Sequence, residues 1–360
     1  MIGISVYPYK EELEQTIEYV KMAGELGVKR LFTNFLAVDN IQEEVEKYRA
    51  VFQVAQTYKM EIAIDATPSI FEILNIEKND FSFFAELGVT IIRLDTGSDG
   101  LQEALYSFNE QNLKIELNIS YDNPHIKTIL SYMPKKESLL GCHNFYPQTY
   151  TGLELEHFLR CTKNVQALGL RTAAFVASQA VNTHGPHNYD DKVCTLETHR
   201  NLHITTQAKH LLAMGIDDVI IANAYATKEE IQALVSLSSD YLEFNLVMEE
   251  NVSAVEQQIL FNNLHFNRGD INAYVHRSTY VKLTVSAEEI PAQNTPKKIQ
   301  RGDVTIGNGN IGQYKGELNI IKQEQNNIIA GKNKVGTILE EEQFLIDYIE
   351  PWTKFKFKKL

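Results

Sequence analysis

The sequence has little of several residue types, and each shortage excludes a class of protein. Its 360 residues include three cysteines, an odd number without CxxC spacing, which argues against a disulfide framework and a zinc site. It has no uninterrupted apolar run of about 18 residues, the length that a membrane-spanning helix needs. Its opening residues lack the basic stretch and apolar run of a secretory signal. We therefore expect a cytoplasmic protein with no membrane partner.

Basic residues are also scarce. The chain has 34 Lys and Arg against 47 Asp and Glu, which gives a formal net charge of −13. Contacts with a phosphate backbone need a basic surface, so we expect no nucleic-acid partner. A small anionic substrate is still compatible with this composition, because a few local Arg side chains can hold it.

Residues 1–238 alternate short apolar runs with amphipathic helical patterns. Eight such units predict a (β/α)8 TIM barrel, which belongs to the α/β class. A doubly wound open sheet is the alternative, but the turn after the first expected strand has no GxGxxG pattern. The expected strands are residues 2–6, 29–32, 61–65, 90–95, 114–119, 140–145, 171–176 and 218–222, and the expected helices are residues 13–26, 41–58, 81–87, 101–109, 126–133, 155–168 and 198–214.

The pattern changes to short β-rich pieces beyond about residue 239. We expect strands at residues 280–285, 303–306, 317–321 and 335–339, separated by turns rich in Gly and Asn. This spacing indicates a small all-β barrel or sandwich at residues 239–360. The Gly/Asn cluster at residues 307–310 lacks a GK[ST] ending, so we interpret it as turns and not as a phosphate loop. The tail at residues 352–360 alternates lysines with aromatics and predicts a half-exposed final strand.

Polar side chains follow the apolar runs of four consecutive expected strands. Side chains alternate across a strand, so Ile115, Leu117 and Ile119 fall on one face of the fifth strand and Glu116 and Asn118 on the other. The polar faces should point into the barrel, whose strands converge at their carboxyl ends on one mouth. The residues expected at this mouth are Asp65, Arg93, Asp95, Glu116, Asn118, His143, Asn144 and Tyr146, with Tyr7 and Asn34 after the first two strands.

Several carboxylates around one mouth supply the groups that glycoside cleavage needs. One must carry a proton for the leaving oxygen, and another must be ionised to act as nucleophile or general base. Asp65, Asp95 and Glu116 are the candidate catalytic residues, and Arg93 beside Asp95 would hold one carboxylate ionised. The pattern does not assign the tasks among the three acids. The alternative is a structural network in which Arg93 only neutralises its neighbours.

A metal site is a second interpretation of the mouth. His143, Asp95 and Asp65 are compatible ligand types, but no HxH or HExxH spacing supports them, so we expect no metal and no cofactor. A lone histidine is more often a core residue. Beside Asn144 and Tyr146, however, we expect His143 to contact a ligand.

The segment after the seventh expected strand suggests anion binding. Thr195 is a candidate N-cap for the helix at residues 198–214. Glu197, His199 and Arg200 would then lie in its first turn, near strands 7 and 8, where barrels often bind phosphate. We expect Arg200 to capture an anion there, and the alternative is a capping carboxylate with solvated charges.

These residues carry a resemblance to the 6-phospho-N-acetylmuramidase family that extends over nearly the whole chain. The first-domain pieces are Ile64-Asp65-Ala66-Thr67-Pro68, Arg93-Leu94-Asp95-Thr96-Gly97, Glu116-Leu117-Asn118-Ile119-Ser120, His143-Asn144-Phe145-Tyr146-Pro147 with Thr151-Gly152, and Thr195-Leu196-Glu197-Thr198-His199-Arg200. Arg301-Gly302-Asp303 and Tyr314-Lys315-Gly316-Glu317-Leu318 resemble the second domain of that family. The chain departs from the family at Asp191-Lys192-Val193-Cys194, where Glu-Gly-Leu-Pro is expected, and this loop bears on sugar specificity.

The resemblance implies a bacterial cytoplasmic enzyme of peptidoglycan recycling, with a TIM barrel joined to a cyclophilin-like barrel. It implies hydrolysis of the β-1,4 bond of N-acetylmuramic acid 6-phosphate–N-acetylglucosamine. Arg93 and Arg200 are then the candidates to hold the phosphate and the lactyl carboxylate. The second domain is expected to support a homodimer or to close over the mouth. Two other functions stay open, namely a metal-dependent sugar-phosphate isomerase or epimerase and a non-catalytic sugar-phosphate-binding protein.

Overall fold

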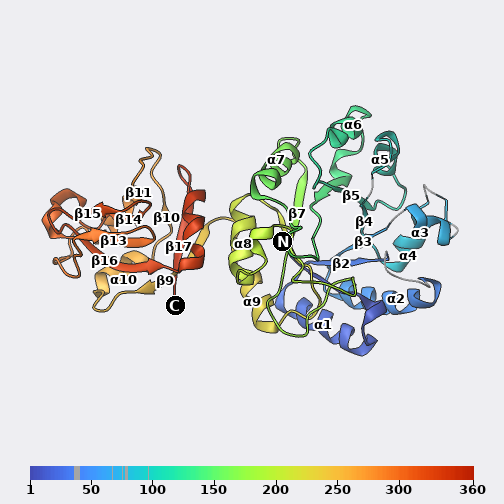
Figure 1. Ribbon diagram of the computed structural model, residues 1–360, viewed down its shortest axis with the longest axis horizontal. Coiled ribbons are helices and arrows are strands. Elements are labelled where there is room, and N and C mark those ends of the chain that lie inside the picture. Colours follow the sequence, from blue (N-terminus) through green and yellow to red (C-terminus); the bar gives the residue numbers. More distant parts are fainter. Residues whose placement is uncertain (36–40, 67, 75, 78–79, 96) are drawn as a thin grey trace. The chain divides into compact units, whose positions relative to one another are not determined.

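The protein forms two compact units in a computed structural model (Figure 1). The structure describes residues 1–35, 41–66, 68–74, 76–77, 80–95 and 97–360. The first unit is Met1–Ser236 and the second is Leu237–Leu360. Thr67 and Thr96, which belong to the motifs quoted above, lie outside the described residues.

Eight parallel strands close into a barrel in the first unit, in chain order. The ring closes because β1 pairs with both β2 and β8. The strands are β1 (Ile2–Ser5), β2 (Arg30–Asn34), β3 (Glu61–Asp65), β4 (Ile91–Leu94), β5 (Lys114–Asn118), β6 (Leu139–Cys142), β7 (Arg171–Val176) and β8 (Asp218–Ile221). The predicted (β/α)8 barrel is confirmed, and an open doubly wound sheet is ruled out.

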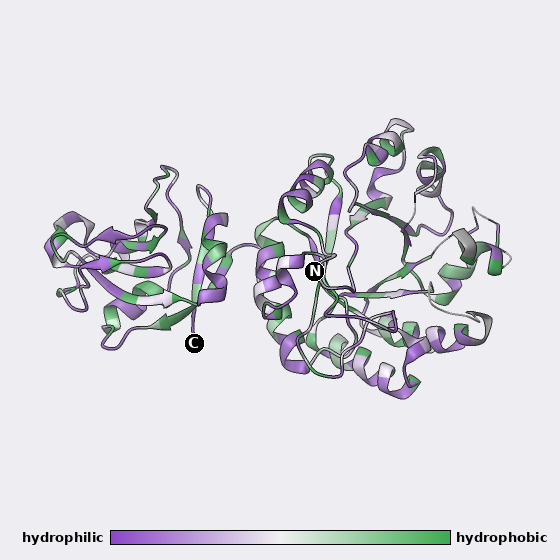
Figure 2. Ribbon diagram, viewed as in Figure 1, coloured by the Kyte–Doolittle hydropathy of each residue, from purple (hydrophilic) through white to green (hydrophobic). Residues whose placement is uncertain are grey.

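Helices surround the barrel (Figure 1), and each carries both hydrophobic and hydrophilic residues (Figure 2), as expected for elements between a core and water. They are α1 (Leu13–Leu26), α2 (Ile41–Thr57), α3 (Pro68–Ile73), α4 (Ser82–Leu87), α5 (Leu101–Tyr106), α6 (His125–Ser131), α7 (Leu155–Gln166), α8 (Ile204–Ala213) and α9 (Lys228–Val235). α1 ends at Gly27, whose φ of 102° lets its N–H bond back to Ala23 and Gly24 before the chain enters β2. The sequence patterns do not predict α3 or α9.

The helix predicted at residues 198–214 begins later than expected. The structure has a 3-10 turn at Glu197–His199, and α8 starts only after it. Thr195 does not cap a helix, because its hydroxyl oxygen accepts from the Phe175 N–H at 2.9 Å and donates to the Asn144 carbonyl oxygen at 2.8 Å. This segment therefore fastens the ends of β6 and β7 together.

The barrel interior is layered along its axis. Apolar side chains fill its middle, and they include Phe32, Ala63, Ile91, Leu140, Cys142, Ala173, Phe175 and Ile220. Charged side chains lie below this layer, and polar ones lie at the mouth. The register aligns Asp65 on β3 with Arg93 on β4, and Arg93 with Glu116 on β5. The predicted inward direction of these side chains is confirmed by the ion pairs that they form across the interior.

The second unit is built on a seven-stranded mixed sheet, in the order β10-β17-β9-β16-β13-β14-β11. Its end strands also contact one another, so the sheet nearly closes into a barrel. The strands are β9 (Leu242–Met248), β10 (His265–Phe266), β11 (Val275–Ser278), β13 (Asp303–Gly307), β14 (Leu318–Ile321), β16 (Lys332–Ile338) and β17 (Lys354–Lys359); β12 (Lys298–Ile299) pairs separately with β15 (Gln325–Asn326), and α10 is Ala254–Phe261.

Two expectations for this unit have different outcomes. The strand predicted at residues 280–285 is wrong, because Tyr280–Val285 forms a 3-10 helix that buries Val281 and Val285. The half-exposed final strand is confirmed, since Phe355 and Phe357 of β17 are buried and the lysines between and around them are not. Over the described ranges, no helix has the length and apolar character needed to cross a membrane.

Candidate active site

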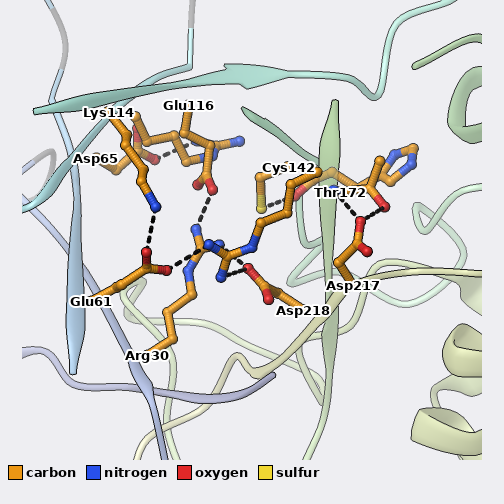
Figure 3. Close-up of polar contacts among 12 residues, drawn as sticks. Arg30, Glu61, Asp65, Lys114, Glu116, Cys142, Thr172, Asp217 and Asp218 are labelled. Atoms are coloured by element: carbon orange, nitrogen blue, oxygen red, sulfur yellow. Dashed lines mark hydrogen bonds and ion pairs between the residues drawn. The ribbon is translucent and has the colours of Figure 1, made fainter. Parts of the chain in front are cut away.

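A layer of ion pairs fills the barrel on the side away from the mouth (Figure 3). Arg30 donates to Glu116 and, at 2.7 Å, to Asp218, and all three side chains are buried. Glu61 pairs with Lys114 at 2.6 Å and with Arg171 at 2.7 Å. Buried charges are tolerated only when paired, so this layer is a mutually neutralised support for the mouth above it.

Arg93 holds two carboxylates at the mouth. Its Nη1 donates to Asp65 Oδ2 at 2.7 Å and to Asp95 Oδ1 at 3.3 Å. Because one nitrogen binds both oxygens, these oxygens are no more than about 6 Å apart. Its Nη2 donates to the Asn144 side-chain oxygen, which fixes the plane of the guanidinium. The register of β3 and β4 creates this arrangement.

Asp65 is a buried carboxyl group with a perturbed pKa. Burial raises the pKa from 3.8 to about 6, Arg93 opposes this shift, and the negative charges of Asp95 and Glu116 add to it. Its Oδ1 is buried and has no hydrogen-bond partner among the residues that the structure describes. Near neutral pH such a group exchanges a proton readily, as a general acid or base must.

Asp95 is the more open of the two carboxylates, with 33% of its side chain exposed. The Asn118 side-chain N–H groups reach its carboxylate at 3.3 Å and its carbonyl oxygen at 3.2 Å. Asn118 is oriented in turn by accepting from the Ser120 N–H at 2.9 Å. Asp95 is thus held from two sides, by Arg93 and Asn118, and is accessible to a substrate.

Three further predicted residues border this pair. Asn34 is aligned with Asp65 in the sheet, and its buried Oδ1 has no hydrogen-bond partner within the described part of the chain. Asn144 contacts Arg93 as described. Tyr146 is half-buried beside Ser120, and burial raises the pKa of its hydroxyl, with the Asp95 charge adding to the shift. Asn34 and Asp65 therefore each leave an acceptor oxygen for a ligand.

Glu116 lies deeper than the other candidate acids. Its side chain is 0% exposed, and one oxygen accepts from Arg30 while the other lies 3.9 Å from Arg93 Nε. Glu116 is thus the member of the ion layer that lies nearest Arg93, and it acts on Asp65 by charge, with no exposed surface for contact with a substrate.

His143 and Tyr7 lie outside the mouth. The His143 ring packs against Phe158 of α7 with centroids 4.3 Å apart, and its Nε2 is 2.8 Å from Thr162 Oγ1. Burial lowers the pKa of His143 to about 3, so it is a neutral core histidine on the helix side of β6. The buried Tyr7 hydroxyl donates to the Ala222 carbonyl oxygen at 2.6 Å and is not free for a ligand.

Glu197 and Arg200 form a structural clamp. Arg200 donates to both oxygens of Glu197, at 2.9 and 2.7 Å, and to the carbonyl oxygens of Tyr146, Asp191 and Lys192. Its side chain is 3% exposed. With the guanidinium used in this way, the structure does not support the expected capture of an anion by Arg200.

The rest of this motif is also structural. Glu197 accepts from the N–H groups of Tyr150 and Gly152, and its pKa is lowered to about 2, chiefly by the Arg200 hydrogen bond. A Cβ on Gly152 would lie 2.7 Å from the Glu197 nitrogen, so the position requires glycine. His199 is buried with its Nε2 2.8 Å from His210 Nδ1, away from the mouth.

An aromatic group lies where β1, β7 and β8 end, and it joins the predicted Tyr7 to His184 and Tyr225, which are not among the predicted site residues. The His184 ring is 6.1 Å from the Tyr7 ring and 5.7 Å from the Tyr225 ring. Tyr225 has a φ of 65°, which is uncommon for a bulky residue. The sequence signal that indicates this group is the position of Tyr225, which follows the strand predicted at residues 218–222. Across the part of the chain that the structure describes, no three His, Cys, Asp or Glu side chains are grouped to hold a metal ion.

A closed (β/α)8 barrel with charged and polar side chains gathered at the carboxyl ends of its strands has the architecture of a barrel enzyme. The family comparison makes the class specific. The chain matches the family models 6-phospho-N-acetylmuramidase, N-terminal, over residues 2–236 and 6-phospho-N-acetylmuramidase, C-terminal, over residues 242–358. It belongs to the 6-phospho-N-acetylmuramidase family and is a glycosidase, so the resemblance read from the motifs is confirmed.

Solved structures of similar chains agree with this fold. An uncharacterised B. cereus protein is 42% identical, with 99% of each chain covered and a TM-score of 0.90. A conserved protein of unknown function from Enterococcus faecalis is 25% identical, with 100% of this chain and 96% of that chain covered and a TM-score of 0.71. The comparison with curated proteins gave no significant match.

Proposed function

We propose that this protein hydrolyses the β-1,4 bond of N-acetylmuramic acid 6-phosphate–N-acetylglucosamine in the cytoplasm, as a step of peptidoglycan recycling. The family membership supports the substrate. The observation that carries the chemistry is the sharing of Arg93 Nη1 by Asp65 and Asp95. One of these acids is buried with a pKa of about 6, and the other is exposed and paired. Such a difference in environment is how two similar carboxyl groups take two tasks.

Asp65 is the proton donor in this proposal. Its proton goes to the bridging oxygen as the bond from that oxygen to the anomeric carbon breaks. A pKa of about 6 keeps a useful fraction of the group protonated near neutral pH while leaving it acidic enough to donate. Its unpartnered Oδ1 and that of Asn34 supply acceptors for hydroxyl or acetamido groups of the sugar.

Asp95 is the nucleophile. Retaining glycosidases hold their two carboxyl groups about 5–5.5 Å apart, and inverting ones about 6.5–9.5 Å apart. Asp65 Oδ2 and Asp95 Oδ1 are no more than about 6 Å apart, which is shorter than the inverting range and favours the retaining arrangement. Asp95 then forms an ester with the anomeric carbon. Water breaks this ester and returns its proton to Asp65, so both carboxyl groups are restored.

Glu116 and Arg93 position and tune the pair. Arg93 binds and orients both Asp65 and Asp95, while the charge of Glu116 supports the raised pKa of Asp65. Neither Arg93 nor Arg200 is free to bind the phosphate, because Arg93 is bonded to Asp65 and Asp95 and Arg200 is bonded to Glu197.

The test is incubation with the phosphorylated and the unphosphorylated muramyl disaccharide, with and without a chelator, followed by mass spectrometry of the products. We expect cleavage of the phosphorylated form in both conditions. Asp65→Asn and Asp95→Asn should each lower kcat by about 10²–10⁴-fold. Asp217→Asn, at the exposed opposite end of the barrel, is the matched control and should not change kcat. Cleavage of neither disaccharide would sink the proposal, and loss of activity on chelation would favour the metal-dependent alternative.

A further inference from the structure

The second unit has a surface cavity of about 680 Å³ that the proposed function does not use. It is formed by the loop after β10, by the start of the Tyr280–Val285 3-10 helix and by the turn before β17. Its volume is within the range of about 300–1,000 Å³ that is usual for small-molecule sites. Its lining includes Arg268, Asp270, Tyr280, Lys282, Leu283 and Trp352.

Trp352 is the sole tryptophan of the sequence, and it is held in a strained position. Its φ of 65° is left-handed, which is costly for a large side chain, yet 58% of the residue is exposed. The turn is fixed by the Trp352 N–H, which donates to the Asn267 carbonyl oxygen at 3.1 Å. A Cβ on Gly269 would lie 2.7 Å from the indole, so the ring lies directly on the Gly269 backbone. An exposed ring fixed at such a cost is a feature of binding sites.

The indole is one end of an aromatic row. Phe266 lies between Trp352 and Tyr280, with ring centroids at 6.1 and 5.2 Å and interplanar angles of 32° and 33°. Tyr280 is 54% exposed. Phe266 packs in a tilted, partly stacked manner against both rings and supports them from outside the lining of the cavity, while Trp352 and Tyr280 line it. Each of these two rings pairs an apolar face with one polar group, the indole N–H or the phenol hydroxyl.

The polar wall of the cavity holds one ion pair, Arg268–Asp270, and one further positive charge, that of Lys282. Arg268 binds Asp270 through two parallel contacts, Nε to Oδ1 at 2.6 Å and Nη2 to Oδ2 at 2.8 Å. Lys282 Nζ donates to the Gln313 carbonyl oxygen at 2.9 Å. A guanidinium beside a carboxylate presents donors and acceptors side by side, which suits neighbouring hydroxyl groups better than an anion.

We propose that this cavity binds a neutral saccharide of one or two hexose units. The apolar face of a pyranose ring packs on Trp352 and Tyr280, and its hydroxyl groups bond to the Arg268–Asp270 pair. A protein partner fits less well, because a stable interface needs roughly 20–30 residues on each side, and this cavity is far smaller. The site lies in the second unit and does not depend on the proposed barrel chemistry.

Trp352 makes the test specific, because any change in tryptophan emission comes from this site. The full-length protein is titrated with N-acetylglucosamine, N,N′-diacetylchitobiose and maltose, and with glycerol as a control. A saturable change in emission with at least one saccharide, and none with glycerol, supports the proposal. No saturable change with any saccharide overturns it. A change in emission that depends on protein concentration and not on saccharide concentration would mean that the cavity lies in an interface between copies of the protein. That result also overturns the proposal.

Variants separate binding from folding. Trp352→Gly suits the left-handed backbone, so it removes the ring without adding strain. By calorimetric titration, Trp352→Gly and Tyr280→Ala should each weaken binding about tenfold or more. The control is Tyr274→Ala, which removes a tyrosine that is 55% exposed and outside the cavity. Unchanged binding in Trp352→Gly, or equal weakening in Tyr274→Ala, contradicts the assignment. Disaccharide cleavage should be unaffected in all three variants.

Discussion

The raised pKa of Asp65 gives a kinetic prediction with a defined magnitude. If Asp65 donates the proton, kcat/KM should fall about tenfold for each pH unit above about pH 6, since only the protonated form is active. The perturbation that isolates this effect is Asp65→Asn, which keeps the shape of the side chain and cannot donate a carboxyl proton. The residual kcat/KM of Asp65→Asn should not show this fall above about pH 6. The assay is release of N-acetylglucosamine between about pH 5 and about pH 8.5.

The same group links stability to pH. Its pKa is 3.8 in an ordinary environment and about 6 in the folded protein, so the folded state binds this proton more tightly than the unfolded state. The resulting stability is fully present below about pH 4 and is lost as the pH rises through about 6. A shift of about two pKa units corresponds to about 3 kcal/mol. Asp65→Asn should lack this dependence, so its free energy of unfolding relative to wild type should rise by about 3 kcal/mol between pH 4 and pH 7.

Two results would refute this reasoning. A wild-type kcat/KM that stays constant from about pH 5 to about pH 8.5 means that Asp65 does not titrate there or does not donate. Turnover by Asp65→Asn equal to that of the control Asp217→Asn removes Asp65 from the chemistry altogether. Denaturant titrations of both variants at each pH show whether either change acts through folding.

Three further outcomes follow from the geometry. Because the Asp65 and Asp95 oxygens are within about 6 Å, proton NMR of the first product should show retention of the β-anomer, and an α-anomer would contradict the assigned spacing. Arg200→Ala should cost about 1.5–3 kcal/mol of stability by removing the hydrogen bonds to Glu197; a raised KM for the phosphorylated substrate with an unchanged melting temperature would indicate that Arg200 binds an anion. Gly152→Ala should lower the melting temperature, since its methyl group meets the Glu197 backbone at 2.7 Å, and an unchanged thermal melt would argue against that contact.

The sequence predicts the directions of the side chains well where the period of a single strand decides them. Alternation along β3, β4 and β5 correctly turns Asp65, Arg93 and Glu116 inward, because the period of two is a property of each strand alone. The same alternation beyond β6 puts His143 on the helix side, opposite to Cys142 and Asn144, and the structure agrees, so the expected contact of His143 with a ligand conflicts with strand parity. Thr227 and Glu230 form a capping box that marks α9 and was available in the sequence.

Other features depend on contacts that no local pattern contains. The carbonyl oxygens that occupy Arg200 come from two loops that meet only in the folded barrel. Residues 280–285 have a composition typical of strands, but burial of Val281 and Val285 selects a 3-10 helix. The pKa of Asp65 depends on Asp95 and on burial at the mouth, so it could not be predicted from the sequence.

The ion layer below the mouth constrains which substitutions the barrel can accept during evolution. Arg30, Lys114 and Arg171 face Glu61, Glu116 and Asp218 from five different strands, so a slip of one strand would leave a charge unpaired. The layer thereby selects one register among those that an apolar interior alone would allow. Replacing one charged residue of the layer leaves its partner as an unpaired charge inside the barrel, which is strongly destabilising. Replacing both partners by apolar residues costs little stability. We expect these six positions to vary together in related chains, while single exchanges among them are eliminated.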